Sequence, residues 1–115
     1  MKAVLAGLAL VAPTAAFATP TYLDCQLPSR QGPRVARLAV DEDHKAVVYQ
    51  LPSQKLSTTL PAVFTTREVT FVVRDDAGEN TFSVNRFNWS VQRYKKTGSK
   101  RSDIAYGSCS VTTQP

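Results

Sequence analysis

Residues 68–85 read EVTFVVRDDAGENTFSVN, and this stretch decides the fold class. Apolar side chains alternate with other residues on both sides of a polar segment: Val69, Phe71 and Val73 precede it, and Phe82 and Val84 follow it. A two-residue period places such side chains on one face of a β-strand. The Asp and Gly residues of 75–78 tolerate the backbone of a turn. The stretch therefore predicts an antiparallel hairpin with strands over 68–74 and 80–85.

The same alternation continues along the chain on both sides of this hairpin. β-Branched and aromatic residues fill these runs, as a half-buried pleated surface favours. In the last run the alternating apolar residues are Ile104 and Tyr106. The further predicted strands cover 35–40, 46–51, 89–94 and 102–108.

Polar segments separate these strands. Turns are predicted at 41–44 and 97–99, a break is predicted near 86–88, and 52–61 is predicted to be a long loop. The result is seven or eight short antiparallel strands, spaced as in a barrel or a sandwich. We predict an all-β fold, namely a small antiparallel β-barrel, because closure removes the exposed edges of a small sheet. A β-sandwich is the alternative.

The two cysteines, Cys25 and Cys109, lie near the two ends of the predicted barrel domain. Only one intramolecular pairing is possible, and a bond between the first and last strands suits a closed barrel. Free thiols and a metal site are the alternatives. Zinc usually takes four ligands, and His44, the single histidine, cannot complete a set without carboxylates. We therefore predict one disulfide that closes the barrel.

The first eighteen residues predict an export signal. Met1-Lys2 supplies a positive start, residues 3–11 form an apolar run, and 16–18 offer the small residues that a signal peptidase requires. A buried N-terminal helix is the alternative. With residues 1–18 as a signal peptide, residues 19–115 form a single predicted domain with no transmembrane segment. The expected location is the periplasm or the exterior of the cell.

The charge balance favours anionic partners. The whole chain carries a formal charge of +5, and removal of Lys2 leaves 13 basic and 9 acidic residues, a net charge of +4. The basic residues gather around the predicted turn at 97–99. The candidate ligand-binding residues are Arg93, Tyr94, Lys95, Lys96, Lys100 and Arg101. Tyr94, with Trp89, would supply stacking if the ligand were single-stranded nucleic acid. A solvated hairpin tip is the alternative interpretation.

No catalytic constellation is found in the sequence. The acidic turn 41–43 beside His44 does not match the ligand spacing of an EF-hand loop. Asp75 and Asp76 are adjacent in a predicted turn, and nothing fixes the separation that a glycosidase needs. Both cysteines are assigned to the disulfide, which leaves no nucleophile paired with a base. We predict a protein that is not an enzyme and takes no cofactor or metal.

Two resemblances accompany these residues. Residues 81–86, with the closing Gly107-Ser108-Cys109, loosely resemble small exported proteobacterial β-barrel proteins of unknown role. This match is partial, because Asn88-Trp89 stands near the position of a Thr-Gly pair, and it implies no activity. The layout is also similar to the periplasmic lysozyme inhibitors, in architecture only. Their Ser-Gly-x-x-Tyr-like inhibitory segment is not visible, and a net charge of +4 would repel basic lysozymes.

Three functions follow as expectations. The first is a non-enzymatic periplasmic or secreted binding protein, such as an inhibitor or an immunity-like factor, that captures a protein partner through barrel loops. The second is a basic envelope-surface module that binds an anionic ligand, whether a lipid headgroup, a polysaccharide or a nucleic acid. The third, an enzyme that uses His44 and sparse carboxylates, lacks a supporting pattern.

Overall fold

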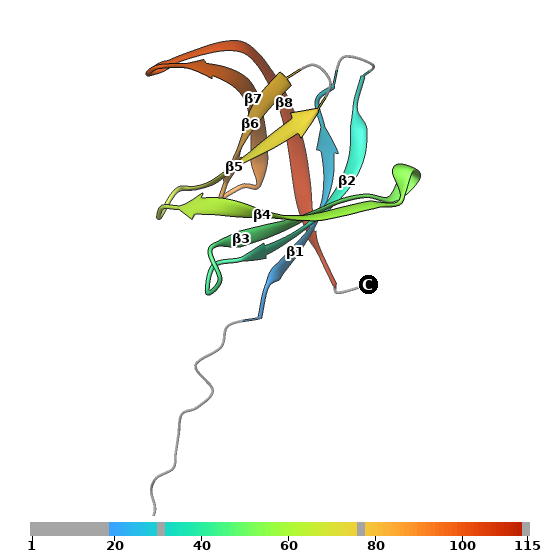
Figure 1. Ribbon diagram of the computed structural model, residues 1–115. Coiled ribbons are helices and arrows are strands. Elements are labelled where there is room, and N and C mark those ends of the chain that lie inside the picture. Colours follow the sequence, from blue (N-terminus) through green and yellow to red (C-terminus); the bar gives the residue numbers. More distant parts are fainter. Residues whose placement is uncertain (1–18, 30–31, 76–77, 114–115) are drawn as a thin grey trace, which may run out of the picture.

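The computed structural model describes residues 19–29, 32–75 and 78–113, so the predicted signal peptide at 1–18 lies outside the described residues. Eight antiparallel strands form a closed barrel in chain order (Figure 1). The predicted all-β barrel is therefore confirmed, and the sandwich alternative is not the observed fold. The strands are β1 (Thr21–Leu27), β2 (Arg34–Asp41), β3 (Ala46–Leu51), β4 (Leu56–Phe64), β5 (Glu68–Asp75), β6 (Gly78–Asn85), β7 (Ser90–Thr97) and β8 (Lys100–Thr112).

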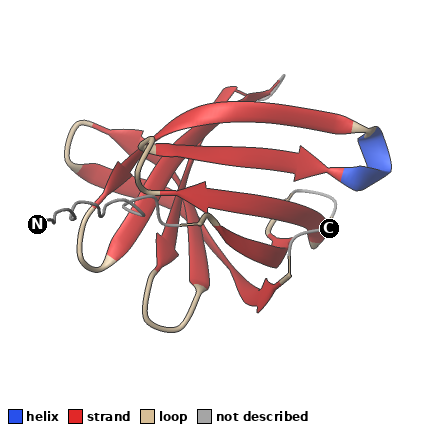
Figure 2. Cartoon of the chain, turned by 90° about the horizontal axis from the view of Figure 1, so that it is seen from below, coloured by secondary structure: helices blue, strands red, loops and turns tan. Residues whose placement is uncertain are grey.

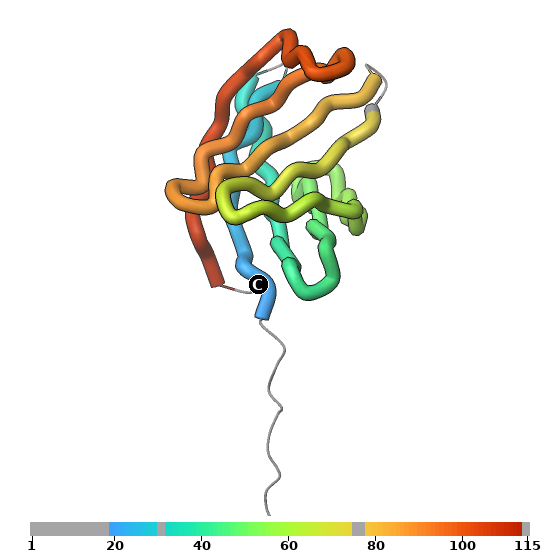
Figure 3. The backbone as a smooth tube through the Cα atoms, turned by 90° about the vertical axis from the view of Figure 1, so that its left-hand side faces the viewer, coloured from blue at the N-terminus to red at the C-terminus, as the bar shows by residue number. Residues whose placement is uncertain are grey.

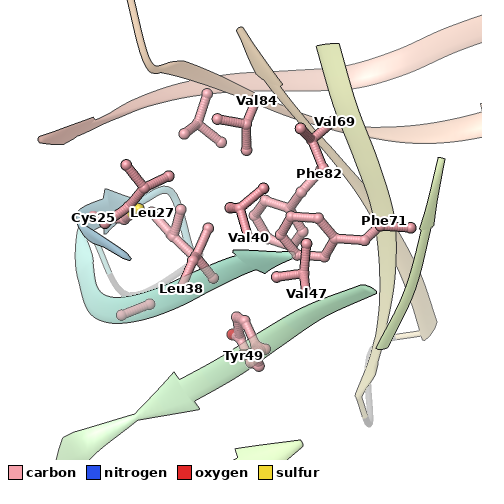
Figure 4. Close-up of a cluster of buried hydrophobic side chains, with 14 of the residues drawn as sticks. Cys25, Leu27, Leu38, Val40, Val47, Tyr49, Val69, Phe71, Phe82 and Val84 are labelled. Carbon is pink, nitrogen blue, oxygen red and sulfur yellow. The ribbon is translucent and has the colours of Figure 1, made fainter. Parts of the chain in front are cut away.

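The hairpin predicted at 68–85 forms the β5–β6 pair and carries the centre of the core. Phe71 lies opposite Phe82 in the ladder, and their stacked rings have centroids 5.6 Å apart. The ring of Tyr49 on β3 is tilted against that of Phe71, with the two centroids 6.4 Å apart. These inward side chains meet aliphatic residues from the facing strands (Figure 4). The apolar residues of the alternating pattern lie on the inner face of β5 and β6. Phe71 and Phe82 share this face because directly opposite residues point to the same side of a sheet.

The interior of the barrel is packed with apolar side chains. This core removes large aliphatic and aromatic groups from water, which is the main favourable contribution to folding in a domain of this size. Its largest fully buried members are Leu23, Cys25, Leu27, Leu38, Val47, Val69, Phe71, Val84 and Val91.

Closure joins the first strand to the last, which run side by side in Figures 1 and 3. Cys25 of β1 lies directly opposite Cys109 of β8, with Cα atoms 4.0 Å apart, and the two form the predicted disulfide. Close to this bond, Gly107 lets the strands approach. A Cβ atom at this position would lie 2.2 Å from the carbonyl oxygen of Gln26. The absence of a side chain at Gly107 is therefore a condition of closure.

The prediction of a loop over 52–61 was wrong for most of that segment. A short 3-10 helix, η2 (Pro52–Gln54), is followed by Lys55 in the left-handed region at φ 52°, and β4 then begins at Leu56. β4 pairs with β3 at six successive positions but with β5 at only three, Ala62 to Phe64. The β3–β4 end consequently projects beyond the rest of the barrel (Figure 2).

Candidate functional site

A β-bulge lies within the basic segment predicted to bind a ligand, residues 93–101. The pairing of β7 with β8 shifts register between Arg93 and Lys95. Arg93 lies opposite the core residue Phe82, so its side chain is on the inner face and is only 13% exposed. Tyr94 lies opposite Thr81 on the outer face. Adjacent residues of a strand point to opposite faces, so the alternation of β7 by itself separates Arg93 from Tyr94. The register shift follows Arg93, where the extra residue lies on β8 between Ala105 and Ser102.

Tyr94 is buried although it belongs to the outer face. Its exposed fraction is 3%, and the guanidinium of Arg101 lies over its ring at 4.2 Å from the centroid. Arg101 also donates a hydrogen bond to Oε1 of Gln92 at 2.6 Å. The structure thus brings Tyr94 and Arg101 together, but in an internal cation–π contact. The face of Tyr94 is already occupied, which removes it as a stacking platform for a base.

The cations at the tip of the β7–β8 hairpin lack counter-charges. Among the described residues, Lys95, Lys96, Lys100 and Arg101 form no ion pair. Arg93 reaches only Asp103, at 4.0 Å. Three other arginines are compensated, since the pairs Arg37–Asp24, Arg74–Glu79 and Arg86–Glu42 are 2.9, 2.5 and 2.6 Å long. The hairpin tip is therefore a local excess of positive charge.

A polar hollow of about 170 Å³ adjoins this tip on the outer face of β6, β7 and β8. Ser83, Gln92 and Tyr106 form one row across the three strands, because Ser83 lies opposite Gln92 of β7, and Gln92 lies opposite Tyr106 of β8. Ser83 is 3% exposed, and its hydroxyl has no hydrogen-bond partner among the described residues. Tyr106, at the rim, is 73% exposed. Arg101 joins the hollow to the hairpin tip.

Tyr106 lies on the outer face of β8. Ile104 and Tyr106 were expected to alternate with polar residues on one face of a strand; they share one face, and it is the outer one, where they are 43% and 73% exposed. The signal that finds the correct face is Cys109. Because Cys109 must point inward to reach Cys25, the alternation of β8 turns Tyr106 and Ser108 outward.

The remaining candidates lie elsewhere and do not assemble a reactive site. His44 is exposed in the β2–β3 turn, where its Nδ1 lies 2.7 Å from Oδ2 of Asp41 and its backbone N–H donates to Oδ1 of the same residue. This is turn chemistry of an Asp side chain. Trp89, at φ 61°, is half-buried and packs against the core. Asp75 ends β5, and Asp76 lies outside the described residues.

The described residues contain no cluster of three or more His, Cys, Asp or Glu side chains arranged to hold a metal ion. No helix within these residues is long and apolar enough to cross a membrane. No protein-family model matches the chain, and comparisons with curated proteins and with solved structures also find no match. The case for a function therefore depends on the surface chemistry of this barrel.

Proposed function

We propose that this protein is a non-enzymatic binding protein that acts outside the cytoplasm and captures a negatively charged partner at the β7–β8 hairpin. The observation that carries the proposal is the uncompensated charge of the tip. Lys95, Lys96, Lys100 and Arg101 have no carboxylate partner among the described residues. A patch of one sign attracts a partner of the opposite sign and raises the rate of association.

The filled interior supports binding on the outside of the barrel. Small eight-stranded barrels either fill their interior with side chains or enclose one small ligand. Here the inward residues of the strands form one continuous core, with Phe71 of β5 at 2% and Val47 of β3 at 0% exposure. A ligand is therefore expected at loops or on the outer face, where the hairpin tip lies.

The disulfide supports a location outside the cytoplasm. Bonds of this kind persist in oxidising compartments and are rare where thioredoxin and glutathione keep thiols reduced. Cys25 and Cys109 are paired, and no free cysteine is present among the described residues. The predicted signal peptide at 1–18 points to the same location.

The test compares two variants with equal net charge. In the first, Lys95, Lys96 and Lys100 are each replaced by Gln; in the control, Lys45, Lys55 and Arg67 are replaced instead. Both are applied to an immobilised polyanion and eluted with a salt gradient. We expect the hairpin variant to elute at a lower salt concentration than the control. The control keeps the lysines that contact the polyanion, so more salt is needed to screen that contact. Equal elution of the two variants would overturn the proposal.

A pull-down from envelope extract with the same two variants identifies the physiological partner. The partner should be captured by the wild type and by the control, and lost with the hairpin variant. Capture that is unaffected by the hairpin substitutions would place the binding surface elsewhere and contradict the proposal.

A further inference from the structure

The hollow beside the hairpin contains a buried hydroxyl with an unfulfilled hydrogen-bonding requirement. Ser83 lines this hollow, is 3% exposed, and its Oγ atom has no partner among the described residues. Buried polar groups in folded proteins are almost always hydrogen-bonded, and an unpaired one lowers stability. An alanine at this position would fit the strand without that cost. Oγ of Ser83 is fully enclosed in the free protein, so a ligand in the hollow supplies the missing partner once a neighbouring side chain shifts to open the way to it.

The other groups around Ser83 offer both donors and acceptors. Ser90 can donate and accept, Gln92 retains its amide N–H groups after accepting from Arg101, and Glu68 contributes a carboxylate. A bare phosphate would face the carboxylate of Glu68 and could not donate to it. Hydroxyl groups both donate and accept, so a ligand rich in hydroxyls satisfies all of these side chains.

Tyr106 provides a flat apolar surface at the rim. Its side chain lines the hollow and is 73% exposed. The negative face of an aromatic ring attracts weakly positive edges such as the C–H bonds on one face of a sugar ring. A hexose unit has one apolar face and a rim of hydroxyl groups. The exposed ring of Tyr106 matches the apolar face, and the polar side chains that line the hollow match the hydroxyl groups.

The size of the surface indicates one unit of a chain rather than a whole small molecule. The hollow measures about 170 Å³, below the roughly 300–1,000 Å³ of sites for drug-sized ligands. A second hollow of about 270 Å³ lies on the other side of Tyr106, against Gln26, Pro28 and Ser108. Tyr106 therefore separates two adjacent depressions, which gives a chain of linked units a path across β8. The strands that form this path lie side by side in Figures 1 and 3.

We infer that the outer face of β6, β7 and β8 binds an acidic polysaccharide, with one sugar unit seated on Ser83 and Tyr106 and its acidic groups facing Arg101 and Lys96, which lies opposite Arg101 in the ladder. This inference rests on the proposed function and adds the class of ligand. A single-stranded nucleic acid suits the face less well, because binding of successive bases uses several exposed rings. Among the described residues Tyr106 is the one exposed ring that lines these hollows, and Tyr94 lies beneath Arg101.

The experiment titrates the ¹⁵N-labelled protein with two probes of equal length, an oligogalacturonate and a neutral chito-oligosaccharide, followed by NMR. We expect shifts at Ser83, Gln92 and Tyr106 with both probes and tighter binding of the acidic one. Tyr106→Ala should weaken both about three- to tenfold. Phe87→Ala is the matched control, since Phe87 is 75% exposed and lines neither hollow, and it should bind as the wild type does.

A second variant separates binding from folding. Ser83→Ala should bind both probes more weakly while it unfolds at an equal or higher temperature, because it removes a buried hydroxyl that lacks a partner in the free protein. A merely structural serine would lower stability on substitution and leave affinity unchanged, which would overturn the inference.

Two further probes distinguish failure of the ligand class from failure of the proposed function. The two probes are oligothymidylate and poly-glutamate. If one of them binds in a way that depends on Tyr106 while neither saccharide binds, the polysaccharide is rejected, and the face is assigned to nucleic acid or to an acidic protein. Polyanion retention that depends on the hairpin lysines without any shift at Ser83 or Tyr106 would reject the inference and keep the proposed function. Loss of that dependence would reject both.

Discussion

The guanidinium of Arg86 lies 2.6 Å from the carboxylate of Glu42, although the two residues are 44 positions apart. Arg86 follows β6, and Glu42 belongs to the turn between β2 and β3. The same guanidinium donates to the carbonyl oxygen of Thr65, between β4 and β5, at 2.5 Å. One side chain thus connects three loops at the end of the barrel opposite the β7–β8 hairpin.

This connection predicts a pH dependence of stability. The hydrogen bond from Arg86 lowers the pKa of Glu42 below its ordinary value of 4.5. A carboxylate whose pKa is lowered in the folded state stabilises that state above the ordinary pKa, and the contribution is lost as the pH falls through the lowered value. Glu42→Gln should therefore unfold at lower denaturant than the wild type at neutral pH, and the difference should shrink in acid.

The control for this prediction is Glu79→Gln. Its pair with Arg74 joins two strands of one hairpin and is largely exposed, so its removal should change stability little. Urea midpoints at neutral pH and well below the ordinary glutamate pKa provide the measurement. A difference between Glu42→Gln and wild type that is the same at both pH values would contradict the assignment.

Gly107 should tolerate no side chain. A Cβ atom there would lie 2.2 Å from the carbonyl oxygen of Gln26 and 2.9 Å from Cδ of Pro28, so strands β1 and β8 would have to separate. We expect Gly107→Ala to lower the free energy of unfolding by about 1–3 kcal/mol, the usual cost of overpacking. Ser108→Ala, one position along and on the outer face, should stay within about 0.5 kcal/mol. Equal urea midpoints for the two variants would refute this account of closure.

The disulfide should stabilise the protein mainly by restricting the conformations of the unfolded chain. It joins residues 84 positions apart that already face each other in the β1–β8 ladder. In the chain-entropy description, a loop of this length is worth about 4 kcal/mol. The double variant Cys25→Ala with Cys109→Ala should lose about that much free energy of unfolding and still form the barrel. Guanidinium unfolding followed by circular dichroism measures both, and an unchanged midpoint would argue against the entropic contribution.

The projecting part of β4 should exchange its amide hydrogens rapidly. β4 is paired with β3 from Leu56 to Pro61, but β5 pairs only with Ala62, Val63 and Phe64. The amides of 57–60 that point away from β3 therefore have no strand partner among the described residues. Hydrogen exchange followed by NMR should find these amides fast and their neighbours on β3 slow. Uniform protection across 57–60 would mean that something covers this edge, for instance a second copy of the chain.

The strand that the sequence analysis missed explains a limit of pattern reading. Residues 56–59 of β4 are exposed, and their sequence, Leu-Ser-Thr-Thr, has no alternation of apolar and polar residues. Hydrophobic periodicity detects a strand only where one face meets the core. This segment is kept extended by its β-branched threonines and by its pairing with β3. The pairing depends on both strands, so the sequence of β4 alone does not reveal it.

The basic segment illustrates the same limit at the candidate site. Because Arg93, Tyr94 and the hairpin lysines are close in the sequence, they were predicted to form one surface. The alternation of β7 turns Arg93 to the inner face and Tyr94 to the outer face. The register shift after Arg93 then pairs Arg101 with Lys96, and the guanidinium of Arg101 lies over the ring of Tyr94. No glycine or proline marks this shift in the sequence, so local composition could not reveal which residue covers Tyr94.

The sequence alone determined that this chain forms antiparallel strands closed by one disulfide, because two-residue alternation and a single pair of cysteines depend on local order and on counting. The tertiary structure decided which outward residues meet. Ser83, Gln92 and Tyr106 come from three strands and form a row only through the registers of β6 with β7 and of β7 with β8. Register is fixed by the packing of the whole core, since a slip of one residue would turn every side chain of a strand to the opposite face.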